Sequence, residues 1–402
     1  MDLQENLNIH FTRVKICVMI KIKIAPNSNL AQSLPQKAYF RRFFIMSGSV
    51  TQTYETQRRI IINEKIEALF KELPPFCREF IHSKATSNKF QPRTRLAYLE
   101  DYMIFFKYLC SSHELFMDIS PKEISTDLLD QLTPQDIESF LHYCETYKSD
   151  SGINENGPAG KARKLSSIRS LFKFLVGRKY LSQNAASFVE TPTIRESDVI
   201  YMNTAEQHRF LNDVYAGRHK NTKDDPSSYD EGNIIHLRDI AIISIFLGTG
   251  IRVSELVGLD LNDVDFGDCS LYVTRKGGKH HQVKFSSDVD DALIAYLDHS
   301  REKLLKGEEH PALFISQRRG RIAVRSVEAL LKKYTDYTFG TGEKHRISPH
   351  KLRSTYATNL IEETNGDINL TAEALGHTGL QSVKRYVAPQ DKSRAAINLR
   401  LK

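Results

Sequence analysis

From Thr53 to about Leu181 the apolar residues of the chain recur at the spacing of amphipathic helices. Two such faces are clear: Ile62, Ile66, Leu69 and Phe70 form the first, and Leu99, Tyr102, Phe106 and Leu109 form the second. The tetrad Thr133-Pro134-Gln135-Asp136 is typical of a helix start, with a capping hydroxyl, a proline at the first position and an acid at the third. We expect a helix from there through Tyr143. The pattern predicts a helical domain over residues 54–181.

The helical pattern ends at residues 182–203. This stretch contains Ser182, Asn184 and Pro192 in a mix of polar residues without periodicity. This composition favours a linker. A helix is expected at 204–215, and the polar stretch at 217–232, rich in Lys, Asp and Ser, is expected to be an exposed loop. A second domain therefore begins near residue 204.

Helical and strand periods both occur in this second domain. An apolar helix is predicted from Leu237 to Leu247, ending at Gly248-Thr249-Gly250. Residues 270–275 and 280–285 alternate like two strands around the turn Gly277-Gly278, which predicts a hairpin. The predicted fold class is mainly α with a small β-sheet: a helical N-terminal domain, then a mixed α/β domain over 204–402 that includes a C-terminal tail.

Basic residues cluster in the helical domain, although the chain of 402 residues has a formal charge of only +7. A helix expected from about Ala162 to Tyr180 turns Leu165, Ile168, Leu171, Phe172 and Leu175 inward. Its other positions and leading edge hold Lys161, Arg163, Lys164, Arg169, Lys173, Arg178 and Lys179, and no acid occurs between Pro158 and Val189. A second acid-free stretch supplies Lys84, Lys89, Arg93 and Arg95. These two surfaces are predicted to bind the phosphates of a DNA duplex.

Several classes of protein are disfavoured. The five cysteines are odd in number, widely spaced and without a C-x-x-C pair, which argues against a disulfide framework or a zinc site. No apolar run approaches the roughly 20 residues of a membrane span, so no membrane partner is expected. A reducing cytoplasm is the expected location. Residues 1–45 carry a net charge of +5 and precede Met46; among a DNA-contacting arm, a flexible tail and residues upstream of the true start, we favour the last two.

Candidate chemistry appears first as two pairs of residues. Arg252 and Glu255 are three apart at a helix start, where the carboxylate can hold the guanidinium. Ser348-Pro349 has the residues of a helix N-terminus, which puts His350 and Arg353 on one face of an anion-binding helix end. Each pair alone has an ordinary structural explanation.

Further candidates are Lys276 at the shoulder of the predicted hairpin and the stretch LGHTGLQSVKRYV, in which Tyr386 follows His377 by nine residues. Together with the two pairs, these residues form a set suited to phosphoryl transfer without metal ligands. H-x-x-R lacks the second His and the Glu of a zinc protease motif, and no P-loop motif occurs. No metal or nucleotide cofactor is therefore expected.

The order Arg252, Lys276, His350-x-x-Arg353, Leu-Gly-His377 and Tyr386 resembles the catalytic signature of the tyrosine recombinase (phage integrase) family. The resemblance covers about residues 54–400 and implies a helical core-binding domain before the catalytic domain. Within the family the chain looks similar to the Xer branch, in particular to the single-protein XerS type that resolves chromosome dimers.

The resemblance also implies roles for single residues. Tyr386 would attack a DNA phosphate and form a 3′-phosphotyrosyl link, while Arg252 and Arg353 bind its non-bridging oxygens. Lys276 would protonate the departing 5′-oxygen, although Lys279 is an alternative. The remaining roles are implied as follows: acid or base toward the tyrosine for His350, a hydrogen bond to phosphate for His377, and orientation of the first arginine for Glu255.

The partners implied are double-stranded DNA at specific sites and a homotetramer that holds two such sites and passes through a Holliday junction. A DNA translocase is a further possible partner. Three rival functions stay open: an integrase of a mobile genetic element, a catalytically silent, site-specific DNA-binding protein, and a type IB topoisomerase, which shares much of the chemistry but relaxes DNA as a monomer. The target sequence does not follow from the chain.

Overall fold

The computed structural model describes residues 54–86, 90–149, 152–194, 199–218, 234–275, 280–341, 347–376 and 383–386. The N-terminal extension and most of the predicted polar loop lie outside these ranges, as do Lys89, Lys276, Lys279 and His377. The described residues fall into two compact units that divide between residues 197 and 198, within the stretch expected to be a linker.

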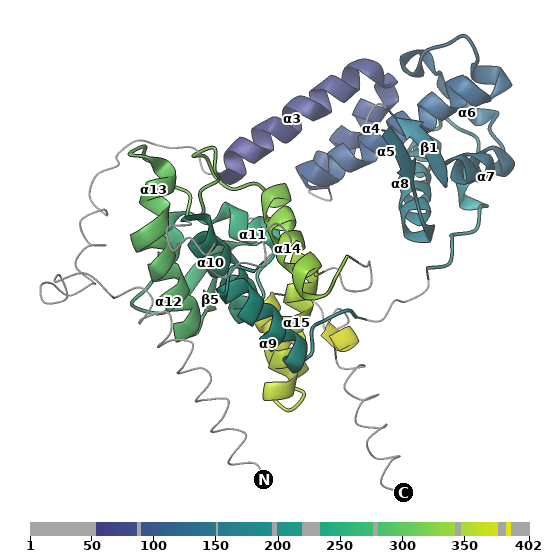
Figure 1. The fold of residues 1–402 in the computed structure, drawn as a ribbon. Helices are drawn as coiled ribbons and strands as arrows, with labels where there is room; N and C mark the ends of the chain where they lie inside the picture. The colour runs from purple at the N-terminus through teal and green to yellow at the C-terminus, as the bar shows by residue number, and fades with distance from the viewer. Residues whose placement is uncertain are drawn as a thin grey trace, which may run out of the picture. The chain divides into compact units, whose positions relative to one another are not determined.

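The first unit is helical, as predicted (Figure 1). Its helices are α3 (Tyr54–Glu72), α4 (Pro75–Thr86), α5 (Pro92–Ser112), α6 (Thr126–Asp130), α7 (Pro134–Tyr143) and α8 (Pro158–Gly177). The predicted start of α7 is confirmed: the Thr133 hydroxyl accepts from the backbone N–H of Asp136, whose carboxylate accepts from the N–H of Thr133 at 2.8 Å. All five residues expected to face inward from α8 are buried.

A short hairpin in this unit was not predicted. Strands β1 (Thr146–Ser149) and β2 (Gly152–Glu155) pair antiparallel between α7 and α8. Their sequence lacks the apolar alternation that marks a strand, and the side chain of Ile153 is 76% exposed. Backbone pairing, rather than burial of an apolar face, holds these strands together, so the hydrophobic pattern gives no signal of them.

The second unit mixes helices with a small sheet. Its helices are α9 (Thr204–Tyr215), α10 (Ile234–Thr249), α11 (Val253–Gly258), α12 (Ser287–Tyr296), α13 (Glu302–Leu305), α14 (Val324–Thr338), α15 (Pro349–Glu363) and α16 (Ile368–Leu375). Strands β3 (Val264–Asp265), β4 (Ser270–Thr274) and β5 (His280–Lys284) form an antiparallel sheet in that order. The expected helices at 204–215 and 237–247 and both expected strands are confirmed.

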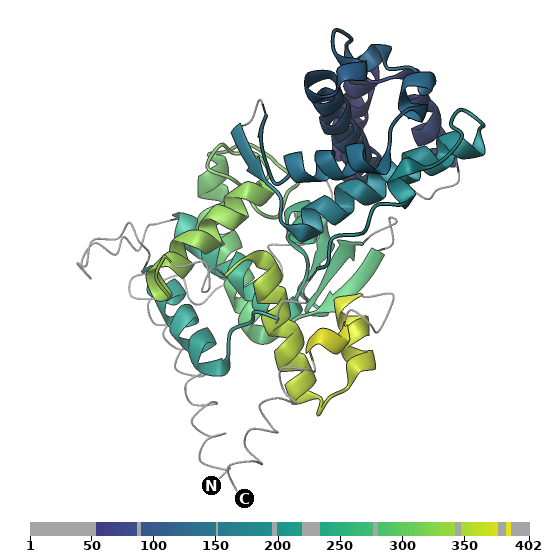
Figure 2. The ribbon, with the colours of Figure 1, turned by 90° about the vertical axis from the view of Figure 1, so that its right-hand side faces the viewer.

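Helix α10 forms the centre of the second unit. It is apolar around most of its circumference, with Ile242, Ile243, Ile245 and Phe246 fully buried, and it packs against α12 and α15. In Figure 2 the sheet, drawn as green arrows, lies beside the yellow helices α15 and α16. Hydrogen bonds of Arg353 and Arg275 bring the N-terminal end of α15 together with the C-terminal ends of α10, β4 and α16, and these ends carry the residues of interest.

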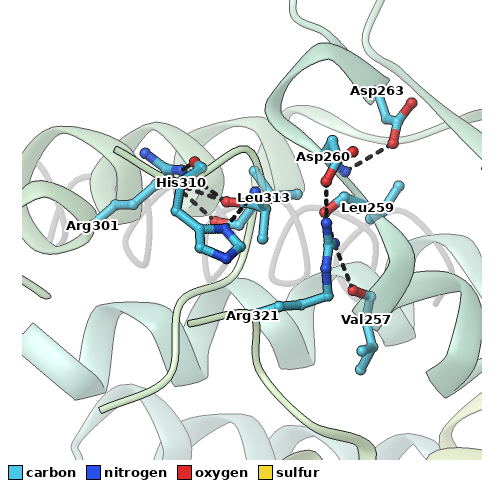
Figure 3. A network of polar contacts seen from close by, with 9 residues as sticks. Val257, Leu259, Asp260, Asp263, Arg301, His310, Leu313 and Arg321 are labelled. Atoms are coloured by element: carbon cyan, nitrogen blue, oxygen red, sulfur yellow. Dashed lines mark hydrogen bonds and ion pairs between the residues drawn. The ribbon is translucent and has the colours of Figure 1, made fainter. Parts of the chain in front are cut away.

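A polar network fixes the chain that follows α11 (Figure 3). The Arg321 guanidinium donates to the carbonyl oxygens of Val257 and Leu259, each at 2.9 Å, and forms an ion pair with Asp260. The backbone N–H of Asp260 donates in turn to the carboxylate of Asp263 at 2.8 Å. These bonds hold the C-terminal end of α11 in place, and so fix a helix whose first turn lies in the candidate site.

In the part of the chain that the structure describes, no helix is long and apolar enough to cross a membrane.

Candidate active site

Arg252 occupies the N-cap position of α11 and is held by a carboxylate one turn along. Glu255 accepts from the backbone N–H of Arg252 at 2.8 Å and from its Nη1 at 2.7 Å. The carboxylate is buried, whereas the arginine side chain is 40% exposed. The pair predicted from the sequence is therefore present, and it leaves part of the guanidinium open to a ligand.

The turn before Arg252 requires a glycine. Gly250 has a φ of +61°, and a Cβ at this position would overlap the ring of Tyr356 on α15. Its carbonyl oxygen accepts a hydrogen bond of 2.5 Å from Nη1 of Arg353. Gly250 is thus constrained in three ways: by its backbone conformation, by close packing and by a hydrogen bond to the second arginine.

Arg353 joins two parts of the site. It lies near the N-terminus of α15, where the side chain of Ser348 caps the helix and Pro349 takes the first position, as expected. The residue is only 3% exposed, and its Nη2 donates to the carbonyl oxygen of Leu375 at 2.6 Å. This guanidinium therefore bridges the turn before α11 and the C-terminal end of α16.

Burial, together with the neighbouring positive charge of Arg252, lowers the pKa of Arg353 to about 10. The group still carries its charge at neutral pH. Two cationic guanidinium groups that repel each other favour an anion between them. This part of the second unit therefore has the electrostatics of a phosphate-binding site.

His350 lies one turn before Arg353 on α15. Desolvation lowers its pKa below the usual 6.5, and the positive charges of Arg385, Arg353 and Arg252 lower it further. The imidazole is therefore neutral at pH 7, and a neutral imidazole can accept a proton.

Tyr386 packs on the two helices that Arg353 connects. It is 2% exposed and belongs to an apolar cluster with Ala357 and Ile361 of α15, and with Ala372 and Leu375 of α16. It is also near enough to Arg353 that a negative charge on its oxygen would raise the pKa of that arginine. The structure thus brings together Arg252, Glu255, His350, Arg353 and Tyr386, while Lys276, Lys279 and His377 lie outside the described residues.

Arg275 is a residue of this site that the sequence analysis did not single out. It follows β4, is 8% exposed and donates from Nη2 to the carbonyl oxygen of Ala374 at 2.9 Å. The charges of Glu255 and Arg252 both act on it. The only indication in the sequence was that a second cation precedes Lys276. Neighbouring cations are common in a basic hairpin, so this one did not stand out.

The predicted phosphate-binding role of Lys164 needs correction. Its ammonium group is buried and lies 3.2 Å from Asp101 of α5, so a DNA phosphate has no access to it. The same carboxylate accepts two hydrogen bonds of 2.6 Å from Arg163, whose side chain is 52% exposed. The stretch around α8 contains no acid, but Asp101 is supplied from 62 residues away, which the local sequence does not reveal.

Arg169 also has a structural position. Its guanidinium donates to the carbonyl oxygens of Ala186, at 2.8 Å, and Val189, and to the hydroxyl of Thr191 at 2.7 Å. It thereby ties the segment after α8 to that helix. Lys161 pairs with Glu145 at 2.6 Å.

The remaining described cations of the predicted DNA surface are more accessible. Lys173 and Arg93 are exposed. Lys84 and Arg95 are half-buried: the ammonium lies 5.3 Å from the ring centre of Phe80, and the guanidinium donates from Nε to the carbonyl oxygen of Phe90 at 3.1 Å. Together with Arg178 and Lys179, which are also exposed, these residues stay candidates for DNA contact.

Comparison with known proteins supports the same interpretation as the geometry, a site that binds phosphate. The profile of the Phage integrase family matches residues 226–393. The chain is 30% identical to tyrosine recombinase XerC of Caldanaerobacter subterraneus subsp. tengcongensis over 341 residues, which cover 83% of this chain and 88% of that protein. It is 31% identical to tyrosine recombinase XerS of Streptococcus uberis, with 82% and 96% covered.

Solved structures are similar in fold. A lambda integrase dimer bound to a COC′ core site matches 77% of this chain and 93% of that chain, with a TM-score of 0.53 and 15% identity. XerH bound to a palindromic difH substrate matches with a TM-score of 0.52 and 18% identity, covering 76% and 80%. Since the 30% identity to a tyrosine recombinase extends over 83% of the chain, the chain belongs to the phage integrase family and is a tyrosine recombinase, an enzyme that cleaves and rejoins DNA.

Proposed function

We propose that the chain is a site-specific recombinase of the Xer type, which exchanges strands between two double-stranded DNA sites. In the proposed reaction the Tyr386 hydroxyl attacks a backbone phosphorus. A tyrosine–phosphorus ester forms at the 3′ side, the bond from phosphorus to the 5′-oxygen breaks, and a free 5′-hydroxyl is left. Because the new ester conserves the energy of the old one, rejoining needs no nucleotide cofactor.

The charged residues would divide the remaining work. Arg252 and Arg353 would bind the two non-bridging oxygens and stabilise the charge of the pentavalent transition state. Neutral His350 would take the proton of the tyrosine hydroxyl, whose ordinary pKa is about 10. Lys276 would give a proton to the departing 5′-oxygen, with Lys279 as the alternative donor. We assign His377 a hydrogen bond to the phosphate.

One observation carries this proposal more than any other. The Arg353 guanidinium binds the backbone on both sides of the site, at Gly250 beside Arg252 and at Leu375 two residues before His377. Tyr386 packs on the same two helices, α15 and α16. Residues separated by more than 130 positions are thus fixed around one point, which a chance set of cations would not require.

The biological role we place first is resolution of chromosome dimers. The family resemblance favours it, and Xer proteins match the chain over more than four fifths of its length. This role implies four protomers on two sites, alternate cleavage through a Holliday junction, and control by a DNA translocase. An integrase of a mobile element is the second candidate, because lambda integrase has the same fold.

The test is formation of a protein–DNA adduct that survives denaturation. Nicked duplexes drawn from the replication-terminus region and from the borders of mobile elements would be incubated with the protein, without metal or ATP. We expect an adduct with the wild-type chain and none with Tyr386→Phe, which should bind DNA within a few-fold of wild type. The fragment that traps the protein distinguishes the two roles. Binding of either fragment without any adduct would instead favour a silent DNA-binding protein.

A further inference from the structure

The end of β4 and the end of α16 are joined by one side chain. Arg275 is the last residue before Lys276, and Ala374, Leu375 and Gly376 lead directly to His377. The Arg275 guanidinium donates to the carbonyl oxygen of Ala374 at 2.9 Å. It also occupies the space over Gly376, where a Cβ would overlap it.

This position suits a cation that holds a helix end. The last carbonyl groups of a helix lack partners within the helix and carry partial negative charge, which favours a positive group nearby. Gly376 ends α16 in the left-handed conformation, with a φ of +63°. That conformation favours glycine, and the missing side chain leaves room for the guanidinium.

The burial of Arg275 costs folding free energy, because the few contacts of its guanidinium do not replace its lost hydration. The residue is 8% exposed, and its Nε has no hydrogen-bond partner among the described residues. Within that same part of the chain, no carboxylate lies at ion-pair distance from it. A buried guanidinium that is only partly satisfied destabilises a fold, so a role in the site is a better explanation than a role in stability.

We infer that Arg275 is a positioning residue for Lys276: by fastening the end of β4 to the C-terminal turn of α16, it holds in place the residue that immediately precedes the general acid in the chain. The inference deepens the proposed function and rests on it. A charged residue that touched the phosphate itself would act on every substrate alike. A residue that acts through the acid matters only when the leaving group needs a proton.

That difference can be measured with a substrate in which sulfur replaces the bridging 5′-oxygen. In the ordinary reaction the phosphorus–oxygen bond breaks and the 5′-oxygen takes a proton from the Lys276 ammonium. In the sulfur substrate the phosphorus–sulfur bond breaks, and the sulfur keeps the electron pair as a thiolate. A thiol has a pKa of about 8.5, so the thiolate leaves without a proton donor.

The experiment compares single-turnover cleavage of both substrates by the full chain and by Arg275→Gln. General acid catalysis contributes about 10²–10⁴-fold. We expect Arg275→Gln to slow cleavage of the oxygen substrate by about 10–100-fold and that of the sulfur substrate by less than about threefold. Gly376→Ala displaces the guanidinium and also strains the helix end next to His377, so it should slow both substrates, but the oxygen substrate more than the sulfur substrate.

A matched control is available in the same unit. Arg301 is also 8% exposed and donates to backbone carbonyl groups, those of Ala312 and Leu313 among them, but it is distant in sequence from every candidate catalytic residue. Arg301→Gln should lower stability without favouring either substrate. It thereby separates general damage to the fold from loss of the acid.

The outcomes are distinct. Selective loss on the oxygen substrate by Arg275→Gln, and a larger loss on that substrate than on the sulfur substrate by Gly376→Ala, support the inference. Equal loss on both substrates by Arg275→Gln, or no loss on either, overturns it, and equal loss would point to direct contact of Arg275 with the phosphate. If the wild-type chain cleaves neither substrate, the proposed function fails first, which is a different result from wild-type cleavage with unselective variants.

Discussion

Arg252 in the second unit and Arg163 in the first were both assigned to DNA phosphates, and a carboxylate holds each of them. Glu255 takes one hydrogen bond of 2.7 Å from the Arg252 side chain and a second from its backbone N–H. Asp101 takes two bonds of 2.6 Å from both Nη atoms of Arg163, and it holds the buried Lys164 as well. The first arrangement leaves guanidinium hydrogens for a phosphate, whereas the second uses the guanidinium mainly for the fold. A cation that the sequence assigns to a DNA-binding surface can therefore bind a phosphate only if other groups of the protein do not already occupy its hydrogen-bond donors.

Among the variants that test this difference between the two units, Arg353→Lys is expected to change the cleavage rate most. Lysine keeps the positive charge but cannot bond Gly250, Leu375 and a phosphate at the same time. We expect adduct formation to slow by about 10²–10³-fold, the usual cost of removing a preorganised donor to developing negative charge. Single-turnover cleavage of a nicked duplex measures it, with DNA affinity as the control. A loss of less than tenfold would mean that charge alone suffices.

Asp101→Asn tests the structural arrangement in the first unit. It leaves the Lys164 ammonium buried without an anion, so the free energy of unfolding should fall by about 3–5 kcal/mol. Urea unfolding measures the change. Glu145→Gln, which removes the exposed partner of Lys161, is the matched control and should alter stability little. Equal effects of the two variants would contradict the burial of the Asp101 cluster.

The lowered pKa of His350 predicts a pH dependence. A general base acts only when unprotonated, and burial together with three arginines holds this pKa below 6.5. The cleavage rate should therefore be insensitive to this group from pH 8 down to 6.5, then fall by about tenfold per pH unit below the lowered pKa. His350→Gln should remove that acidic limb. A wild-type rate that already falls near pH 7.5 through this histidine would contradict the assignment.

The smallest effects should come from the accessible cations of the first unit. Lys173→Gln and Arg93→Gln should each weaken binding a few-fold on any sequence and reduce the salt dependence by about 0.9 in slope. Lys164→Met should leave that slope unchanged, because its ammonium cannot reach a phosphate. Equilibrium binding across salt concentrations distinguishes them. An equal change in slope from Lys164→Met would return that residue to the DNA surface.

The sequence predicted those features whose determinants are close together along the chain. The helix starts at Pro134 and Pro349, the pairing of Arg252 with Glu255 and the inward face of α8 all follow from spacings of one to ten residues. Features set by distant partners were missed. The Asp101 cluster and the contact of Arg275 with Ala374, 99 residues apart, depend on how helices and strands meet. The β1–β2 hairpin was missed for another reason, since its strands bury little.

The central claim is that Tyr386 becomes covalently attached to DNA. The most direct measurement isolates the adduct from a nicked duplex, digests protein and DNA, and locates the attached nucleotide by tandem mass spectrometry. The account predicts a 3′-phosphate ester on Tyr386, together with a free 5′-hydroxyl on the released strand. Attachment to any other residue, or a 5′-phosphate link, would contradict it.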